Sequence, residues 1–303
     1  MGIPGFPVVE RGVQRIMKEP RTIDLGDRAA TLISGGINLM DGGPMMGILP
    51  RPLWSQWYPP DSENRILLET NCLLIESEGG KCLIESGCGN KLTEKERRFY
   101  GGSNPDWVGH SLEAIGHTPS SINRVILTHL HTDHAGGIVC MDTNGIDSPT
   151  FCQATVLVCS TELDEARLGI GITPNAYDDR NWKALENNGA LIPAAPGADL
   201  GMGFSYYPTP GHTNGHQSVL ITGAKGKILF TGDVLPLFRL AVPYYNMAFD
   251  VAPVINAQSK RRLLEQACRE EWILVLSHEP DVPICRCVEK PGKSFPFVLQ
   301  PVD

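Results

Sequence analysis

No run of about 18 or more consecutive apolar residues occurs in this chain of 303 residues, so no segment is predicted to span a bilayer as a helix. The N-terminal stretch MGIPGFPVVERG has neither the basic start nor the apolar core of a signal peptide. Gly2 is not followed by serine or threonine at the sixth position, which argues against myristoylation. The sequence therefore favours a cytoplasmic protein.

Positive charge is also scarce, because 26 lysines and arginines stand against 34 aspartates and glutamates, a net charge of −8. Phosphate binding depends on clustered cations, so this balance argues against a nucleic-acid partner and against a polybasic membrane anchor. The densest basic runs, 95–98 and 260–262, are predicted to be solvated helix faces. We expect a small-molecule substrate rather than a polyanionic partner.

CxxC spacing is absent, although the chain has nine cysteines. An odd number without that spacing predicts neither a disulfide framework nor a zinc ribbon. We expect most of these cysteines to be small buried hydrophobic residues. Internal repeats and low-complexity tracts are absent as well.

Histidine, in contrast, is concentrated in the stretch THLHTDHAGG, residues 128–137. The apolar run 125–127 before it predicts a buried strand ending at Thr128. Residues two apart on an extended backbone point to the same side, so His129 and His131 can reach one cation. Asp133 and His134 follow after the chain begins to turn at small residues, and they would face a second centre beside the first.

Three further residues of metal-binding type each follow an apolar run of strand length. His212 lies in TPGHTNGH after 204–207, Asp233 in FTGD after 227–230, and His278 in SHEP after 273–276. All are therefore predicted to lie at one edge of a sheet. Together the seven residues make a nitrogen and oxygen donor set without thiolate, which suits Zn²⁺, although Mn²⁺, Fe²⁺ or Co²⁺ can use the same ligands.

This spacing resembles the metallo-β-lactamase superfamily in its dinuclear hydrolase branch, over the chain from about Ile66 to Pro280. The resemblance implies two divalent metal ions, of which zinc is the expected kind. It implies that the first ion is held by His129, His131 and His212, and the second by Asp133, His134 and His278. It also implies that Asp233 bridges the two ions.

A finer resemblance links the segments 39–77, ESGCGNK (85–91) and TGDVLP (231–236) to N-acyl-homoserine lactonases and methyl parathion hydrolases. It implies a quorum-quenching lactonase or carboxylesterase, with phosphotriesters as the alternative substrate. The chain departs from this subgroup by carrying Glu85 where aspartate is usual and Asn214 where proline is usual.

The lactonases also have a substrate-contacting tyrosine shortly after the bridging aspartate, where this chain has 234–237, VLPL. Tyr244 or Tyr245 either takes that role or packs as an ordinary rim residue. Apolar side chains of the segment 39–77 either line an acyl pocket or form ordinary core; they are Met45, Met46, Leu49, Trp54 and Trp57. We assign His216 to a supporting or capping role, because seven ligands are already placed.

Because the candidate ligands run from 129 to 278, both halves of the chain must build one site. We therefore predict a single domain, 1–303, with an αββα sandwich of two mixed sheets flanked by helices, in which the segment 1–65 contributes to a substrate pocket or a dimer contact. Relatives of this kind are often homodimers. Predicted strands are 30–37, 66–76, 81–85, 124–128, 154–159, 217–222 and 227–231, and predicted helices are 161–168, with Ser160 as N-cap, and 257–270.

The expected mechanism follows from two adjacent cations, roughly 3.5 to 4 Å apart, which lower the pKa of a shared water to near neutrality. In this hypothesis the bridging hydroxide attacks a carbonyl or phosphoryl centre, and Asp133 passes the proton to the leaving group. No serine or cysteine nucleophile is required. Purified protein that stayed fully active without metal would contradict it.

Alternatives from other classes share the motif. A glyoxalase-II-like thioesterase usually has a helical C-terminal extension, whereas only 25 residues (303 − 278) follow His278 here. Flavodiiron proteins replace the ligand at 131 with a carboxylate, which disfavours that iron-dependent redox class. A persulfide dioxygenase, a catalytically silent binding module and a tRNA-processing nuclease complete the set.

Overall fold

The computed structural model describes residues 20–100, 107–141, 145, 147–171, 176–292 and 295–302. The N-terminal stretch on which the targeting argument rests, 1–19, lies outside these ranges. None of the helices in the described ranges is long and apolar enough to cross a membrane.

The first sheet has seven strands in the order β1-β2-β3-β4-β5-β8-β9. β1 to β4 pair antiparallel, whereas β4, β5, β8 and β9 run parallel. The parallel strands bring the ends of β4 and β5 to the same edge. The strands are β1 (Arg21–Asp24), β2 (Arg28–Asp41), β3 (Arg65–Ser77), β4 (Gly80–Ile84), β5 (Arg124–Ile126), β8 (Thr155–Cys159) and β9 (Leu191–Ala194).

The second sheet also has seven strands, in the order β10 to β16. Its pairs are antiparallel except β13 and β14, which run parallel and therefore end at the same edge. A separate hairpin pairs β6 (Val139–Met141) with β7 (Asp147–Pro149). The strands are β10 (Asp199–Gly201), β11 (Phe204–Pro208), β12 (Gln217–Gly223), β13 (Gly226–Phe230), β14 (Ile273–Val275), β15 (Ile284–Glu289) and β16 (Phe297–Pro301).

The two sheets pack face to face through one apolar cluster. Leu73, Ile84 and Ile126 of the first sheet join Ile221 and Phe230 of the second in it, all fully or almost fully buried. Alternation of apolar residues along each strand supplies this face. The interface between the sheets is therefore the central core of the molecule.

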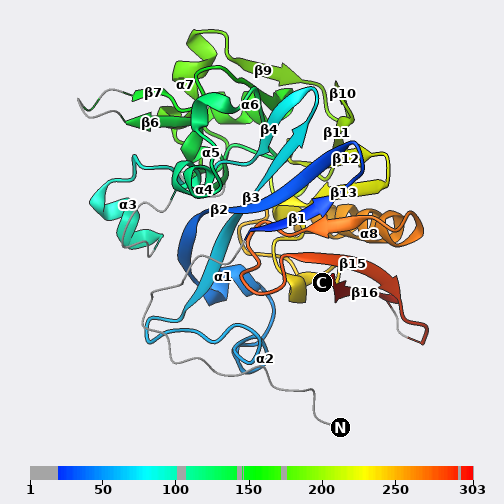
Figure 1. Ribbon diagram of the computed structural model, residues 1–303. Helices are drawn as coiled ribbons and strands as arrows, with labels where there is room; N and C mark the ends of the chain where they lie inside the picture. Colours follow the sequence, from blue (N-terminus) through cyan, green and yellow to red (C-terminus); the bar gives the residue numbers. More distant parts are fainter. Residues whose placement is uncertain are drawn as a thin grey trace.

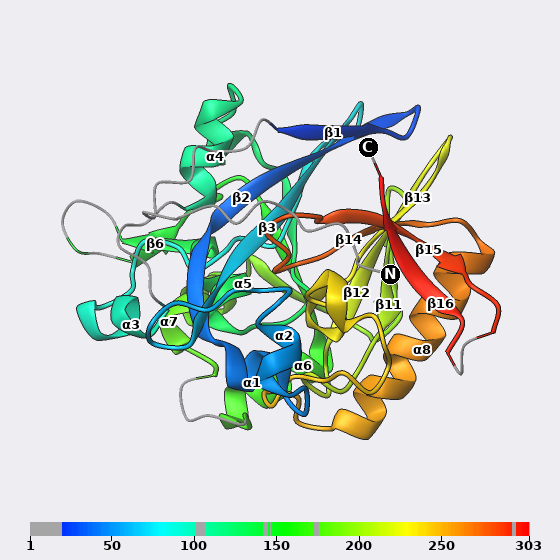
Figure 2. The ribbon, with the colours of Figure 1, turned by 90° about the horizontal axis from the view of Figure 1, so that it is seen from below.

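Helices cover the outer face of each sheet, as Figures 1 and 2 show. On the first sheet lie α4 (Val108–Ala114), α6 (Ser160–Leu168) and α7 (Asp179–Asn187), and α8 (Pro253–Arg269) lies on the second, against β15 and β16. This arrangement confirms the predicted αββα sandwich. Shorter helices are α1 (Gly42–Met46), α2 (Arg51–Trp54), α3 (Glu94–Phe99) and α5 (Thr132–Ala135).

Three local predictions were wrong. Ser160 is not the N-cap of α6, because the chain passes straight from β8 into the helix and Cys159 occupies that position. α8 begins at Pro253 rather than at residue 257, since proline suits the first helical turn. Lys260 is not solvated but 1% exposed, and its Nζ donates to the Tyr245 carbonyl at 2.6 Å.

Candidate metal centre

The candidate ligands lie where strands of both sheets end. His129 and His131 follow β5 of the first sheet, and His131 is the N-cap of α5, whose first turn contains Asp133. His212, Asp233 and His278 follow β11, β13 and β14 of the second sheet. The sequence predicts that the ligands lie at one edge of a single sheet. In the structure they lie where the edges of two sheets meet, and all seven residues come together there.

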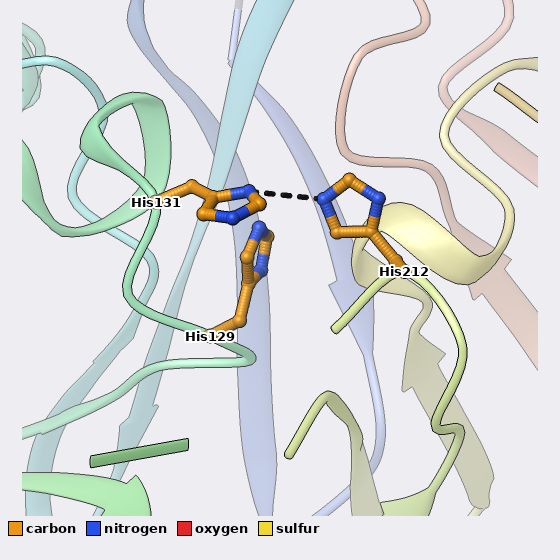
Figure 3. Close-up of side chains that lie close together, drawn as sticks. All are labelled: His129, His131 and His212. Atoms are coloured by element: carbon orange, nitrogen blue, oxygen red, sulfur yellow. Dashed lines mark hydrogen bonds between the residues drawn. The ribbon is translucent and has the colours of Figure 1, made fainter. Parts of the chain in front are cut away.

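The first group consists of His129, His131 and His212 (Figure 3), with one ligand atom of each within 4.8 Å of the others. His131 Nδ1 lies 3.0 Å from His212 Nε2. The Nε2 of His129 is buried and has no hydrogen-bond partner in the described part of the chain. A buried nitrogen without a partner is costly unless something else binds it.

The second group consists of Asp133, His134 and His278, which also lie within 4.8 Å of one another. Nε2 of His134 is 3.2 Å from Nε2 of His278, and Asp133 Oδ2 is 3.6 Å from the same His278 nitrogen. Of the three, Asp133 alone is not buried, with 18% of its side chain exposed.

Asp233 lies between the two groups. Its Oδ1 is 3.2 Å from His278 Nε2 and 3.3 Å from His134 Nε2. Its Oδ2 is 3.4 Å from His212 Nε2. Each carboxylate oxygen therefore faces one group, which is the arrangement a bridging ligand requires.

The outward nitrogens of the histidines are held by hydrogen bonds. Nδ1 of His134 bonds to Glu85 at 3.0 Å, Nδ1 of His212 to Asp250 at 2.9 Å, and Nδ1 of His278 donates to the carbonyl of residue 69 at 2.8 Å. Partners of this kind fix the ring orientation and the tautomer of metal-binding histidines. The inward nitrogens are thereby left to face the centre.

The ionisable groups of the cluster shift one another's pKa values. Burial alone would raise the pKa of Asp233, but His278, His134 and His212 hold it well below its usual range. Burial, followed by repulsion from His134 and the neighbouring histidines, lowers the pKa of His129 well below its usual value. His129 is therefore neutral, whereas in spite of burial Asp233 and neighbouring carboxylates raise the pKa of His134, His212 and His278. A divalent cation would take the place of the protons on these three rings, because a metal-binding histidine must be neutral.

These observations fit a divalent metal site. The inward nitrogens converge, the buried His129 Nε2 has no partner among the described residues, and two carboxylates supply negative charge without any thiolate. Such a donor set suits zinc and the other first-row divalent ions.

His216 has the supporting role that the sequence predicts. Its Nε2 accepts from the Asp233 backbone N–H at 2.9 Å, and its Nδ1 donates to the Thr209 carbonyl at 3.1 Å. Burial lowers its pKa to about 3, so the ring is neutral. Gly232 approaches the ring so closely that a Cβ there would lie 2.5 Å from His216 Nε2, which only glycine avoids.

A cavity of about 730 Å³ opens above the centre, and candidate ligands from both groups form its floor. Its apolar lining includes Met40, Met45, Leu68, Met247 and Phe249. Its polar lining comes from the start of α3 and the start of α7 with their N-caps, namely Thr93, Lys95, Glu96, Asp178, Asp179 and Arg180. The remaining space is lined mainly by Leu92, Phe99, Tyr100, Thr132 and Tyr177.

Comparison with known proteins matches this geometry. A family model described as the metallo-β-lactamase superfamily matches residues 65–139 and 196–278, more than half of the chain. The chain belongs to the metallo-β-lactamase superfamily.

Within this superfamily, an N-acyl homoserine lactonase from Bacillus cereus is 28% identical over 252 residues, covering 77% of this chain and 88% of the relative. A probable metal-dependent hydrolase from Staphylococcus aureus has a similar structure, with a TM-score of 0.81, 26% identity, and coverage of 93% of this chain and 100% of the other. The dizinc quorum-quenching lactonase AidC, in complex with a product, shares the fold at a TM-score of 0.74 and 19% identity, covering 94% and 97%. Metal-dependent hydrolases, lactonases among them, are therefore its relatives and structural neighbours.

The structure does not bring Tyr244 or Tyr245 to the lining of the cavity in this member of the metallo-β-lactamase superfamily. Tyr244 is 56% exposed, and Tyr245 packs against the apolar cluster beneath α8. The tyrosines that do line the cavity are Tyr100 and Tyr177. Both lie in loops outside every motif, so no local pattern in the sequence pointed to them.

The five apolar residues of the segment 39–77 divide between the two roles left open. Met45 lines the cavity. Met46, Leu49 and Trp54 are buried in the core, and Trp57 packs against it. Of the described residues before 66, Met40 and Met45 line the cavity; that the segment 1–65 contributes to a substrate pocket stays a prediction.

Asp250→Asn is expected to weaken metal binding by roughly 10- to 100-fold, as is usual when a hydrogen-bond partner of a metal-binding histidine is changed. Asp250 accepts from His212 and also from the Met247 N–H and the Asn256 side chain, so an amide there would orient His212 less well. Competition with a chelating dye measures the affinity. The exposed Asp164, changed to asparagine, is the control; equal affinities in the two variants would contradict the role of Asp250.

Proposed function

We propose that the protein is a dinuclear metal-dependent hydrolase that opens lactones, N-acyl homoserine lactones first among them, or cleaves related carboxyl esters. The observation that carries the proposal is the convergence of two ligand groups on Asp233 at the floor of the cavity. Lactonases among the relatives give the substrate class its support.

The seven ligand residues would hold two divalent ions, for which we propose zinc. When bound, two such ions supply a hydroxide nucleophile near neutral pH and polarise the substrate oxygen. The chain itself contributes the fixed imidazoles, the shared carboxylate of Asp233 and a cavity that limits access of water. A serine or cysteine nucleophile is not needed.

Asp133 is the residue we assign to proton transfer. Its carboxylate lies at the cavity floor and is partly exposed, unlike the buried Asp233. A lactone ring opened at the centre leaves an alkoxide that needs a proton. Asp133, the partly exposed carboxyl of the ligand set, would take the proton that the attacking hydroxide brings into the new acid group and pass it to this alkoxide.

The walls of the cavity support an amphiphilic substrate. An apolar acyl chain would pack on the methionine-rich lining, where Met40, Met45 and Met247 are adaptable hydrophobic contacts. A polar ring and amide would face the polar lining residues, Glu96 among them. An acyl homoserine lactone combines these two chemistries in one small molecule.

A substrate panel with metal analysis tests the proposal. We expect about two zinc ions per chain and higher kcat/KM for N-acyl homoserine lactones than for an aryl ester, a phosphotriester or S-lactoylglutathione. A higher kcat/KM for the phosphotriester or the thioester would change the proposed substrate class but would not contradict the proposed metal site. Bound iron with no hydrolysis of any compound would refute the proposed function.

A further inference from the structure

Glu162, in the first turn of α6, is a completely buried carboxyl that the proposed reaction does not use. Its relative exposure is 0%. A buried carboxyl is costly unless its oxygens are hydrogen-bonded, so its partners show what it does.

The two oxygens of Glu162 contact two separate ligand-bearing segments. Oε1 accepts from the Leu130 backbone N–H at 3.0 Å, and Leu130 lies between His129 and His131. Oε2 accepts from the hydroxyl of Thr213, the residue after His212. One carboxyl therefore connects the segments that carry all three histidines of the first group.

Close packing of the backbone fixes where this carboxyl lies. A Cβ at Gly215, in the loop of His212, would lie 2.2 Å from the Glu162 backbone nitrogen. The loop thus rests directly on the beginning of α6, and only glycine permits that approach. Leu163 and Ala166 bury the same helix in the core of the first sheet. Glu162 is consequently held by a rigid element.

Tyr177 connects Glu162 to the cavity. Its side chain hydrogen-bonds to Glu162, and it lines the cavity. Its ring centroid lies 5.3 Å from that of His131, and the two residues form an isolated backbone bridge. Burial raises the pKa of Glu162 to about 7, although the hydrogen bonds from Thr213, Leu130 and Tyr177 oppose the shift.

The second group has a buried carboxyl of its own. Glu85 bonds to Nδ1 of His134 through Oε2, and its Oε1 accepts from the Thr128 N–H at 2.6 Å. Among the described residues, the hydrogen-bond partners of Glu162 are Leu130, Thr213 and Tyr177, all on the side of the first group. Glu85 thus contacts a ligand of the second group and also Thr128, the residue before His129, whereas the described contacts of Glu162 are with segments of the first group.

We propose that Glu162 is a positioning residue for the first group only, which sets the separation of His131 and His212 without itself binding the ion. The inference rests on the metal-binding part of the proposed function. In this proposal, Glu162 on α6 affects binding of the ion at the first group and does not affect binding of the ion at the second group.

Glu162→Ala in single-site backgrounds tests this assignment. His278→Ala disables the second group and leaves the first; His131→Ala does the reverse. In the His278→Ala background we expect Glu162→Ala to weaken zinc binding by roughly 10- to 100-fold. In the His131→Ala background the same change should leave zinc affinity within about twofold, because a supporting residue acts through the ligands that it orients, and the described hydrogen bonds of Glu162 lead to the segments of His131 and His212. Chelator competition gives the affinities without any assay of hydrolysis.

Two further variants separate positioning from damage to the fold. Glu162→Gln keeps a carbonyl oxygen for the Leu130 N–H, so it should recover part of the affinity and also serves if the alanine variant does not fold. Glu165→Gln is the matched control, because Glu165 lies on the same helix and bonds to Asn214 of the same loop but is not buried. We expect it to bind zinc as the parent does.

Equal weakening in both single-site backgrounds, or in neither, would overturn the inference while two zinc ions in the parent protein still supported the proposed function. A parent protein that bound no metal would overturn both. Loss confined to the His131→Ala background would assign Glu162 to the other ion and also overturn it.

Discussion

Asp233→Ala is expected to lower kcat/KM for lactone opening by roughly a thousandfold, since metal ions supply several kcal/mol of transition-state stabilisation and each 1.36 kcal/mol is tenfold in rate. Asp233 is the one candidate ligand whose two oxygens face different groups, at 3.2 to 3.4 Å from three histidines. Its removal should therefore disturb both ions at once. Steady-state kinetics with metal content measured on the same samples tests this.

Asp164→Ala is the control for that experiment, because Asp164 is exposed on α6 and, in the described part of the chain, forms an ion pair with the nearby Arg167. It should retain parental activity and metal. If Asp233→Ala kept two ions and full turnover, the carboxylate would not be a bridging ligand. Loss of activity with both ions retained would instead give Asp233 a role in the reaction alone.

Removal of metal by a chelator should lower the melting temperature by roughly 10 °C. Ligand at a thousand times its Kd adds about 4 kcal/mol to the free energy of unfolding, and a domain of similar size shifts by about 2 to 4 °C per kcal/mol. The effect should be large here because the ligands come from loops of both sheets, which metal would hold together. Scanning calorimetry with and without chelator measures the shift.

Two controls make the thermal result specific. Added Zn²⁺ should restore the melting temperature, and Asp233→Ala should respond to chelator much less than the parent. An unchanged melting temperature in the parent, with metal removal verified by mass spectrometry, would show that the loops are held by protein contacts alone.

The candidate ligands could be brought together from the sequence because each lies in a loop or turn that follows an apolar strand, and the resemblance to the superfamily implied which residues form the set; that they bind metal stays a prediction. Local pattern gives the strand, and parallel neighbours such as β13 and β14 bring the strand ends together. His216 could be assigned for the same reason, since the loop that holds His212 also holds it. The positions of these residues follow from short stretches of sequence and from the topology of the sheets.

The cavity walls and the buried charges could not be predicted in this way. Tyr100 and Tyr177 reach the site from loops whose path depends on packing at a distance. Lys260 belongs to a basic run that the sequence predicts to be solvated. Tertiary packing buries its side chain, and the Tyr245 carbonyl accepts a hydrogen bond from its Nζ. Glu162 lies in an ordinary helical pattern, and only the fold shows that it faces two ligand loops.

The candidate ligands are divided between the two sheets, so a bound ion would hold distant parts of the chain together. His131 and His212 are 81 residues apart, and His134 and His278 are 144 residues apart. An ion shared by either pair closes a long loop of chain, and the entropy of such a closure rises only slowly with loop length. Each ion would therefore act as a reversible cross-link between the two halves of the polypeptide, and neither half alone contains a complete set of ligands.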